Sequence, residues 1–272
     1  MINIKALEVA PPPDTTCVDT SDRLSKGRFY KFAKNFNCFY FKRCLKAFTL
    51  AEVLVTLGII GVVSAMTVPS LMQNHQRKTY VTQLHKVYNE IQQVFSLTMT
   101  DKNSLNLFEA GLSSNENAYT TLKKYFNIAN DCGETPVPCF AGEYKGLDGS
   151  VYKPSKGSRC QYTLSLASGA AICFNGLEYK YSYNGVSYPY GFIYVDINGQ
   201  QGPNIAGRDY FLLYYFNDGS LDEAEATPHC RQYGSCGSAS SPQEAREQKS
   251  CSGNWPGGCF GKILNDNWEM NY

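Results

Sequence analysis

Histidine and charged side chains are scarce in this chain of 272 residues. The three histidines are His75, His85 and His229, and Asp, Glu, Lys and Arg together make up 18% of the chain. The sequence has no glycine-rich phosphate loop, no Gly-x-Ser-x-Gly motif and no pair of histidines at metal-ligand spacing. These absences argue against a nucleotide-binding enzyme, a serine hydrolase and a zinc enzyme, so we expect no catalytic site.

Basic residues are concentrated at the start of the chain. Residues 1–47 contain nine Lys and Arg and four Asp and Glu, which leaves 16 basic and 20 acidic residues from position 48 onward. Nucleic-acid binding depends on clustered cations that face phosphates. A remainder with a net charge of −4 (16 − 20) therefore disfavours nucleic acid as a partner.

One long hydrophobic run follows the basic start. Residues 53–74 contain no charged side chain, and a helix of about 20 such residues spans a bilayer core. Residues 23–46 carry eight Lys and Arg and no Asp or Glu. The positive-inside rule therefore predicts a membrane helix whose N-terminal side stays in the cytoplasm.

A cleaved secretory signal peptide is the competing interpretation of this run. The run is longer than a typical signal-peptide core, and it begins with Glu52, a charge that is costly in an apolar helix. A cut near residues 64–66 would be followed by an amphipathic helix and not by the start of a domain. Both features favour a helix that stays on the mature protein.

The residues around this start resemble the N-terminal cleavage and methylation signature of type IV prepilins and type II secretion pseudopilins. The matching residues are KAFTLAEV at 46–53, then Gly58, Gly61 and Pro69. The resemblance implies that a prepilin peptidase cuts between Ala47 and Phe48, after Lys46, and methylates the new amine of Phe48. Ala47 stands where the family usually has Gly, and the leader, residues 1–47, is longer than most.

Two residues of this helix carry the predictions on assembly. The resemblance implies that Glu52 pairs with the Phe48 amine of a neighbouring subunit; the alternative is that Glu52 only reaches toward the lipid headgroups. Pro69 lacks a backbone donor, so we expect a kink or a locally melted helix at 66–69, or, alternatively, the end of the membrane helix.

The next segment predicts an amphipathic helix. Apolar side chains recur at gaps of three and four residues, at Tyr80, Leu84, Val87, Ile91, Val94 and Thr98, with Tyr88 and Phe95 beside them. We therefore expect a membrane and assembly helix over 48–71, an amphipathic helix over 72–101, and an extracytoplasmic domain over 102–272.

The domain is expected to be rich in β-structure. Residues 161–166 and 170–174 predict a hairpin, and the aromatic runs at 190–197 and 210–216 predict two further strands. Residues 118–128 predict a short helix, 104–114 a loop or short helix, and the last segment an edge strand, with Trp268 packing on the core. Helix first and sheet afterwards indicates an α+β fold, with a long kinked helix packed on an antiparallel sheet.

Eight cysteines after position 48 predict a disulfide framework in an oxidising compartment, since they lie among Gly, Asn, Ser and Pro and lack zinc-knuckle spacing. Local loops favour Cys132 with Cys139, Cys230 with Cys236, and Cys251 with Cys259. The hairpin places Cys160 near Cys173. Sequence alone leaves the connectivity open.

The segment from Asp196 to Asp209 contains oxygen side chains before a tight glycine turn. Asp196, Asn198 and Asp209 are candidate ligands for calcium, a cation that prefers oxygen donors. The loop also resembles the Asp-x-Asn-Gly calcium loops of some pseudopilins, although the usual bidentate acid at its end is missing. The alternative is a turn set by glycine and asparagine, with no ion.

The predicted protein is a structural subunit, a pilin or pseudopilin, in the bacterial inner membrane and then in a pilus or pseudopilus. Its expected partners are copies of itself, related pilin subunits and the prepilin peptidase. The alternative is an uncut, single-pass adhesion or binding module with a disulfide-rich ectodomain, for which tyrosine-rich surfaces are suited. A secreted enzyme ranks third.

Overall fold

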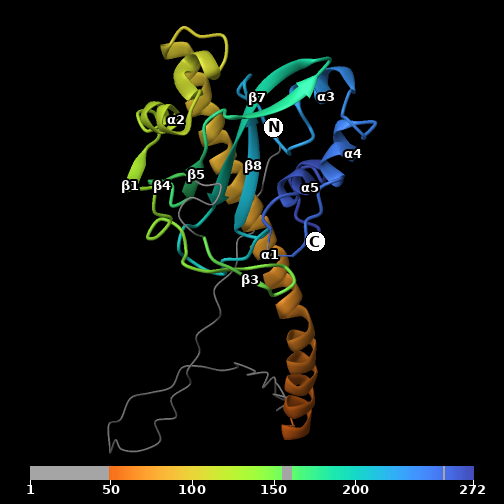
Figure 1. The fold of residues 1–272 in the computed structure, drawn as a ribbon. Helices are drawn as coiled ribbons and strands as arrows, with labels where there is room; N and C mark the ends of the chain where they lie inside the picture. Colours follow the sequence, from red (N-terminus) through yellow and green to blue (C-terminus); the bar gives the residue numbers. More distant parts are fainter. Residues whose placement is uncertain (1–48, 155–160, 254) are drawn as a thin grey trace, which may run out of the picture. The chain divides into compact units, whose positions relative to one another are not determined.

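The fold is that of a computed structural model, which describes residues 49–154, 161–253 and 255–272. Residues Leu54–Tyr272 form one compact unit. It contains a mixed set of elements: one long helix, α1 (Leu50–Asp101), an antiparallel sheet and several short helices. Figure 1 shows α1 in orange along one face of the sheet strands β5, β7 and β8.

Helix α1 is a single helix of 52 residues with two different surfaces. From Leu50 to Met72 its large apolar side chains are all exposed. From Val81 onward one face is buried, and the buried residues are Val81, Leu84, Val87, Ile91, Val94, Phe95 and Thr98. The predicted apolar stripe is confirmed in its position, while Tyr80 and Tyr88 are partly buried at its edge.

Pro69 lies inside α1, and residues 66–69 are all helical. The expectations that the helix melts locally at Pro69 or ends there are therefore wrong; a bend of the axis stays a prediction. Proline removes the donor to the carbonyl four residues earlier. For Pro69 that carbonyl belongs to Ala65. Two residues before the proline, the hydroxyl of Thr67 donates to the Val63 carbonyl at 3.0 Å.

The main sheet has seven strands in the order β1-β4-β5-β7-β8-β9, with β6 paired to the first part of β7. All its pairs are antiparallel, so the α+β class is confirmed. Its strands are β1 (Ile128–Gly133), β4 (Tyr162–Leu166), β5 (Ala171–Phe174), β6 (Tyr179–Tyr183), β7 (Val186–Asp196), β8 (Tyr210–Phe216) and β9 (Leu221–Asp222). Strands β2 (Tyr144–Lys145) and β3 (Val151–Tyr152) form a separate pair.

Both faces of the central strands are covered. On β7, Ile193 and Val195 belong to the core that includes the buried face of α1, whereas Phe192 and Tyr194 pack with the loop residue Phe140 and its neighbours. This double burial explains why the sequence of β7 and β8 is almost continuously apolar or aromatic and does not alternate.

The short helices differ from expectation. Helix α2 (Asn115–Leu122) begins earlier than predicted, because the Ser114 side chain accepts the Asn117 amide, and it ends before 128, where the chain joins strand β1. Residues Phe108–Leu112 form η1, a π-helical turn. The remaining helices are α3 (Pro228–Tyr233), α4 (Pro242–Glu247) and α5 (Cys259–Asn265).

The C-terminal segment was expected to add an edge strand, and this is wrong. It forms α5, and the described residues after α5 contain no strand. The expected packing of Trp268 is confirmed: its ring lies 4.2 Å from the His85 ring and 5.2 Å from the Tyr88 ring, both on α1. The segment forms a helix and not an edge strand because the helix places the buried side chains of α5 in the main core.

Three disulfides join Cys132 to Cys139, Cys230 to Cys236, and Cys251 to Cys259, the pairs that sequence proximity favours. Cys173 is also disulfide-bonded. In the β4–β5 register Thr163 lies opposite Cys173. Cys160 lies outside the described residues, so its pairing with Cys173 stays a prediction.

A buried acidic pair joins β9 to the C-terminal helices. Asp222 receives two hydrogen bonds from the guanidinium of Arg246, at 2.7 and 2.8 Å. Glu223 accepts the amides of Gly258 and Gly261 at 3.1 and 3.3 Å. Burial raises the pKa of Glu223 to about 7. The carboxyl thus orders the start of α5 and is costly in its charged form.

Replacement of Ile91 tests the contribution of the α1 stripe. Ile91 is fully buried in the core, so Ile91→Ala should lower the free energy of unfolding by about 2–5 kcal/mol. Gln93→Ala, at an exposed site two residues away, should change it by less than about 0.5 kcal/mol. Denaturant unfolding of the purified chain in detergent measures both, and equal effects would contradict the packing of α1 on the sheet.

Glu223→Gln tests the cost of the buried carboxyl. Between pH 4.5 and 7 the folded chain holds a proton that the unfolded chain has released, so unfolding free energy should fall as the pH rises through this window. Over this pH window the Glu223 carboxyl lowers the free energy of unfolding by about 3 kcal/mol at most. The neutral amide still accepts the two glycine amides, so the variant should lose this part of the pH dependence.

Melting temperatures at pH 5 and pH 8 measure the difference between the chain and its Glu223→Gln variant. Glu116→Gln, at an exposed position in α2, serves as the matched control and should leave the pH dependence as it is. An unchanged pH dependence in Glu223→Gln would show that the carboxyl is ionised in the folded chain at both pH values.

Candidate functional site

The processing residues Lys46, Ala47 and Phe48 lie outside the described residues, so the cut between Ala47 and Phe48 stays a prediction. The described chain begins at Thr49, directly before the first residue of α1. The adjoining assembly residue, Glu52, is described together with its contacts.

Thr49 and Glu52 form a reciprocal cap at the start of α1. The Glu52 carboxylate oxygen Oε2 accepts the backbone amide of Thr49 at 2.9 Å and its hydroxyl at 3.0 Å. The Glu52 amide in turn donates to the Thr49 hydroxyl at 3.2 Å. The sequence Thr-Leu-Ala-Glu is a capping box, which satisfies two amides that the first turn leaves unpaired. Sequence reasoning missed this function of Glu52, although the Thr-x-x-Glu spacing indicates it.

The surface that follows Glu52 is apolar on every side of the helix. Residues Val53, Leu54, Ile59, Val63 and Met66 are between 42% and 75% exposed. Among the described residues, α1 is the one helix long and apolar enough to cross a membrane. Gly58 and Gly61 have no other atoms within 4 Å of an added Cβ, so their surface is open to a neighbouring helix.

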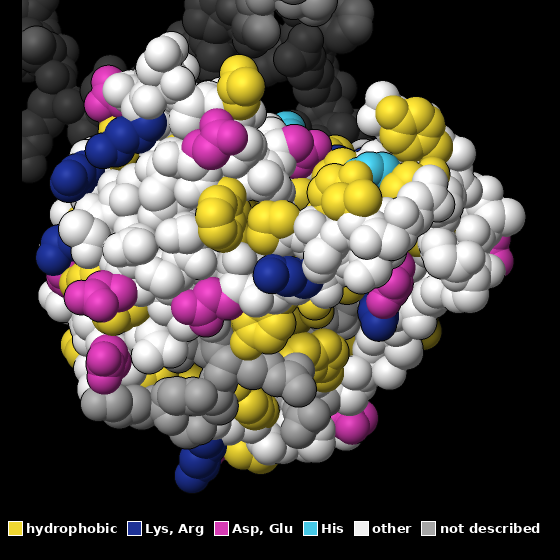
Figure 2. All heavy atoms as spheres, turned by 45° about the horizontal axis from the view of Figure 1, so that its top comes forward, with side chains coloured by type: hydrophobic (Ala, Val, Ile, Leu, Met, Phe, Trp, Pro, Cys, Tyr) yellow, Lys and Arg dark blue, Asp and Glu magenta, His cyan; other side chains and the backbone are white. Residues whose placement is uncertain are grey.

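The rest of the surface is different in kind. Figure 2 shows acidic, basic and polar side chains interspersed with apolar ones over one face of the domain. Such a mixed surface is ordinary for a protein in water, whereas a continuous apolar surface marks contact with lipid or with another protein. The apolar half of α1 is therefore the candidate interaction site.

A second candidate site is the loop between β7 and β8. Asp196 and Asp209, at its two ends, are fully buried. Asp196 accepts the Tyr144 hydroxyl and, at 3.1 Å, the Asn198 amide. Asp209 accepts the amides of Asn204 and Ile205, at 2.7 and 2.6 Å.

The loop brings buried acids and amide oxygens together. Burial, and then the charge of Asp209, raises the pKa of Asp196 to about 8, and burial raises the pKa of Asp209. The side-chain oxygens Oδ1 of Asn198 and Asn204 are buried and accept no hydrogen bond from any described residue. The Asn198 amide group donates to the Gly202 carbonyl at 3.2 Å.

Two carboxyls and two unpaired amide oxygens in one loop are a set of hard oxygen donors, which is the set that calcium prefers. Sequence reasoning selected Asp196, Asn198 and Asp209 and did not select Asn204, although its place in Gly-Pro-Asn before Asp209 indicates a turn residue with an inward oxygen. Within the described part of the chain, no three His, Cys, Asp or Glu side chains are grouped to hold a metal. A site here therefore depends on the asparagines.

An aromatic surface surrounds the third histidine. Tyr181 and Tyr188 are cross-strand neighbours on β6 and β7, with ring centroids 5.4 Å apart. His229 of α3 lies 4.4 Å from the Tyr183 ring and 4.3 Å from the Tyr188 ring, and its Nδ1 lies 3.1 Å from the Tyr181 hydroxyl. Tyrosine rings are common at binding surfaces.

Comparison with known proteins finds one matching family model, the prokaryotic N-terminal methylation motif, over residues 42–68. No curated protein and no solved structure matches the chain. The motif covers the residues before α1, the Thr49–Glu52 cap and the apolar surface up to the turn before Pro69. The chain thus carries the N-terminal methylation signature of type IV prepilins and pseudopilins.

Proposed function

We propose that this chain is a non-catalytic structural subunit of a type IV pilus or a type II secretion pseudopilus. The observation that carries the proposal is the exposed apolar half of α1, which continues without a break into the helix that packs on the sheet. Before assembly the apolar half lies in the bacterial inner membrane, with the basic leader in the cytoplasm and residues 102–272 outside it. After assembly it lies among the same helices of neighbouring subunits.

Length and energetics support this use of α1. Residues 53–72 are 20 residues, or about 30 Å of helix, which equals the thickness of a bilayer core. Each large apolar side chain left in water forgoes about 1.5–3 kcal/mol of burial. Lipid and a bundle of neighbouring helices both remove that cost, so a subunit can pass from one to the other.

The capping box also bears on the function of Glu52. Both hydrogen bonds from Thr49 go to Oε2, and Oε1 accepts no hydrogen bond from a described residue. In our proposal Oε1 receives the methylated amine of Phe48 from the adjacent subunit, which sets the register of the two helices. A carboxylate that is already held by its own helix end loses less side-chain entropy when it forms that pair.

Mass spectrometry of the native protein tests the processing. We expect a mature chain that starts at Phe48 with a methylated amine. An intact leader would contradict the proposal and favour the alternative, an uncut single-pass binding module. The aromatic surface around His229 is the observation that favours that alternative.

Glu52→Ala tests the pairing. The variant should be processed at Phe48 and remain in the membrane, but incorporation into filaments should fall at least tenfold because the amine has lost its partner. Thr49→Ala is the matched control: it removes the hydroxyl of the cap but keeps the backbone amide that donates to Glu52 and keeps the charge, so incorporation should change by less than about threefold. Normal assembly of a processed Glu52→Ala chain would remove the pairing from the proposal.

We also propose that the β7–β8 loop binds calcium through Asp196, Asn198, Asn204 and Asp209. The two buried acids near each other and the two unpaired amide oxygens support it. A bound cation would neutralise the acids and fix the loop next to β7 and β8, so its contribution is to the stability of the domain.

Calorimetric titration of the purified chain in detergent tests the calcium proposal. We expect binding at about 10⁻⁴–10⁻³ M, the range of extracellular calcium modules. Calcium at ten times the dissociation constant should stabilise the fold by about 1.4 kcal/mol. Asn204→Ala should abolish both effects, whereas Asn184→Ala, at the β6–β7 turn, should leave them intact. If millimolar calcium gave no heat of binding, the calcium proposal would be wrong.

A further inference from the structure

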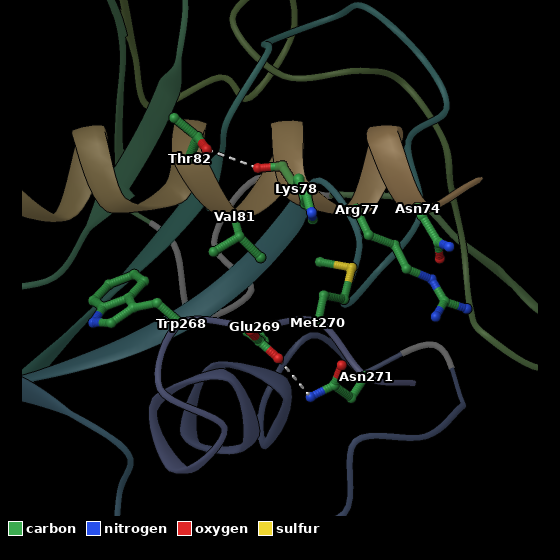
Figure 3. A pocket seen from close by; sticks show the side chains of 9 residues that line it. All are labelled: Asn74, Arg77, Lys78, Val81, Thr82, Trp268, Glu269, Met270 and Asn271. Atoms are coloured by element: carbon green, nitrogen blue, oxygen red, sulfur yellow. Dashed lines mark hydrogen bonds between the residues drawn. The ribbon is translucent and has the colours of Figure 1, made fainter. Parts of the chain in front are cut away.

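A cavity of about 420 Å³ lies between α1 and the chain that follows α5. Figure 3 shows side chains from α1 above it and from residues 268–271 below it. Its lining residues are Asn74, Arg77, Lys78, Val81, Thr82, Trp268, Glu269, Met270 and Asn271. The cavity begins within the first turn after the apolar half of α1, a position that the proposed function does not use.

The cavity combines an apolar floor with unpaired cations. Val81 and Met270 are 7% and 4% exposed and form the floor. Arg77 and Lys78 form no ion pair with any described residue, and the Nε of Arg77 is buried without a hydrogen-bond partner. The acidic residue of the lining, Glu269, accepts the side-chain amide of Asn271 at 3.4 Å. The rim therefore keeps two cations that an anion can pair with.

The depth of this rim matches the headgroup layer of a bilayer. If residues 53–72 cross the hydrocarbon core, Arg77 lies five residues farther on, or about 7.5 Å along the helix axis. The headgroup region on each side of the core is about 5–7.5 Å thick. The backbone of Arg77 is therefore level with its outer edge, and that of Lys78 lies about 1.5 Å beyond.

The directions of the side chains bring the cations closer to the lipid. Side chains of a helix point toward its N-terminus, which for α1 is the membrane side. In Figure 3 the Arg77 side chain extends toward the Asn74 end of the helix. A long cationic side chain that extends toward the membrane places its charge at the level of the lipid phosphates.

We propose that this cavity binds the headgroup of an anionic phospholipid, with the phosphate on Arg77 and Lys78 and the glycerol region over Val81 and Met270. The inference rests on the membrane insertion in the proposed function. The cations without ion pairs, the apolar floor and the continuity with the apolar half of α1 favour lipid over an acidic surface of a neighbouring subunit. The bound lipid holds the base of the domain at the membrane until the subunit leaves for the filament.

Native mass spectrometry of the processed full-length chain in detergent tests the inference, with phosphatidylglycerol and phosphatidylcholine added at equal concentration. We expect the chain to retain phosphatidylglycerol preferentially. The double variant Arg77→Gln, Lys78→Gln should lose roughly 30-fold in affinity for it, since each cation near a membrane surface contributes about fivefold. The control double variant Lys86→Gln, Lys102→Gln changes one exposed lysine on α1 and one directly after it, and it should bind as the parent does.

Misfolding of the double variant would also reduce lipid binding, so a second variant that is expected to bind more tightly is needed. Glu269→Lys removes an anion and adds a cation at an exposed position of the same cavity, a change of two charges, so it should bind phosphatidylglycerol roughly 30-fold more tightly. Equal retention of the two lipids by the parent chain, or no change in either variant, would overturn the inference.

Two further measurements distinguish a phospholipid from the other ligands that could occupy the cavity. Displacement of the lipid by 10 mM inorganic phosphate would identify a site for free phosphate and overturn the lipid assignment. Normal lipid retention by a double variant that fails to enter filaments would identify a contact between subunits, which also overturns it. Extraction of cell membranes at alkaline pH reports insertion by itself: a chain that is released contradicts the proposed function, whereas one that is retained without lipid preference contradicts only this inference.

Discussion

The apolar side chains of residues 50–72 surround α1 on all sides, and the domain covers none of the large ones. Water cannot be their resting environment, because an apolar surface of this size is stable only against lipid or another protein. The helix does not end where this surface ends; it continues through Pro69 into the core of the domain. The apolar half is therefore joined by a continuous helix to the residues of α1 whose side chains pack on the sheet.

The domain is built to receive such a helix. Its sheet is covered on one face by the α1 stripe and on the other by the loop around Phe140 and Tyr144, so the strands are held from both sides. The disulfides close short loops at its periphery, and the Asp222–Arg246 pair joins β9 to α4. A pilin-like subunit needs this rigidity, because the position of its domain in a filament is set by one helix.

Two polar features of the domain are candidate binding sites. The β7–β8 loop gathers buried oxygens, and the cavity beside Arg77 gathers cations at the end of the apolar surface. The two sites differ in what they can attract: the loop suits a small hard cation, and the cavity suits a phosphate with apolar atoms next to it. The methylation motif is that of pilin-type structural proteins.

The sequence by itself determined the features that depend on neighbouring residues. The motif, the uncharged run, the α1 stripe and the strands β7 and β8 follow from local pattern, since the helical and strand periods place neighbouring residues on one face. Proximity in the sequence favoured the three disulfides across short loops but left the connectivity open. Tertiary structure alone decided the rest. The last segment became helix α5 because its apolar side chains found the core, Glu223 became a buried acid because β9 meets Gly258 and Gly261 there, and the cavity exists because residues 268–271 return to α1. These contacts join residues that are far apart in the chain. A local sequence pattern does not indicate which distant residues will pack together.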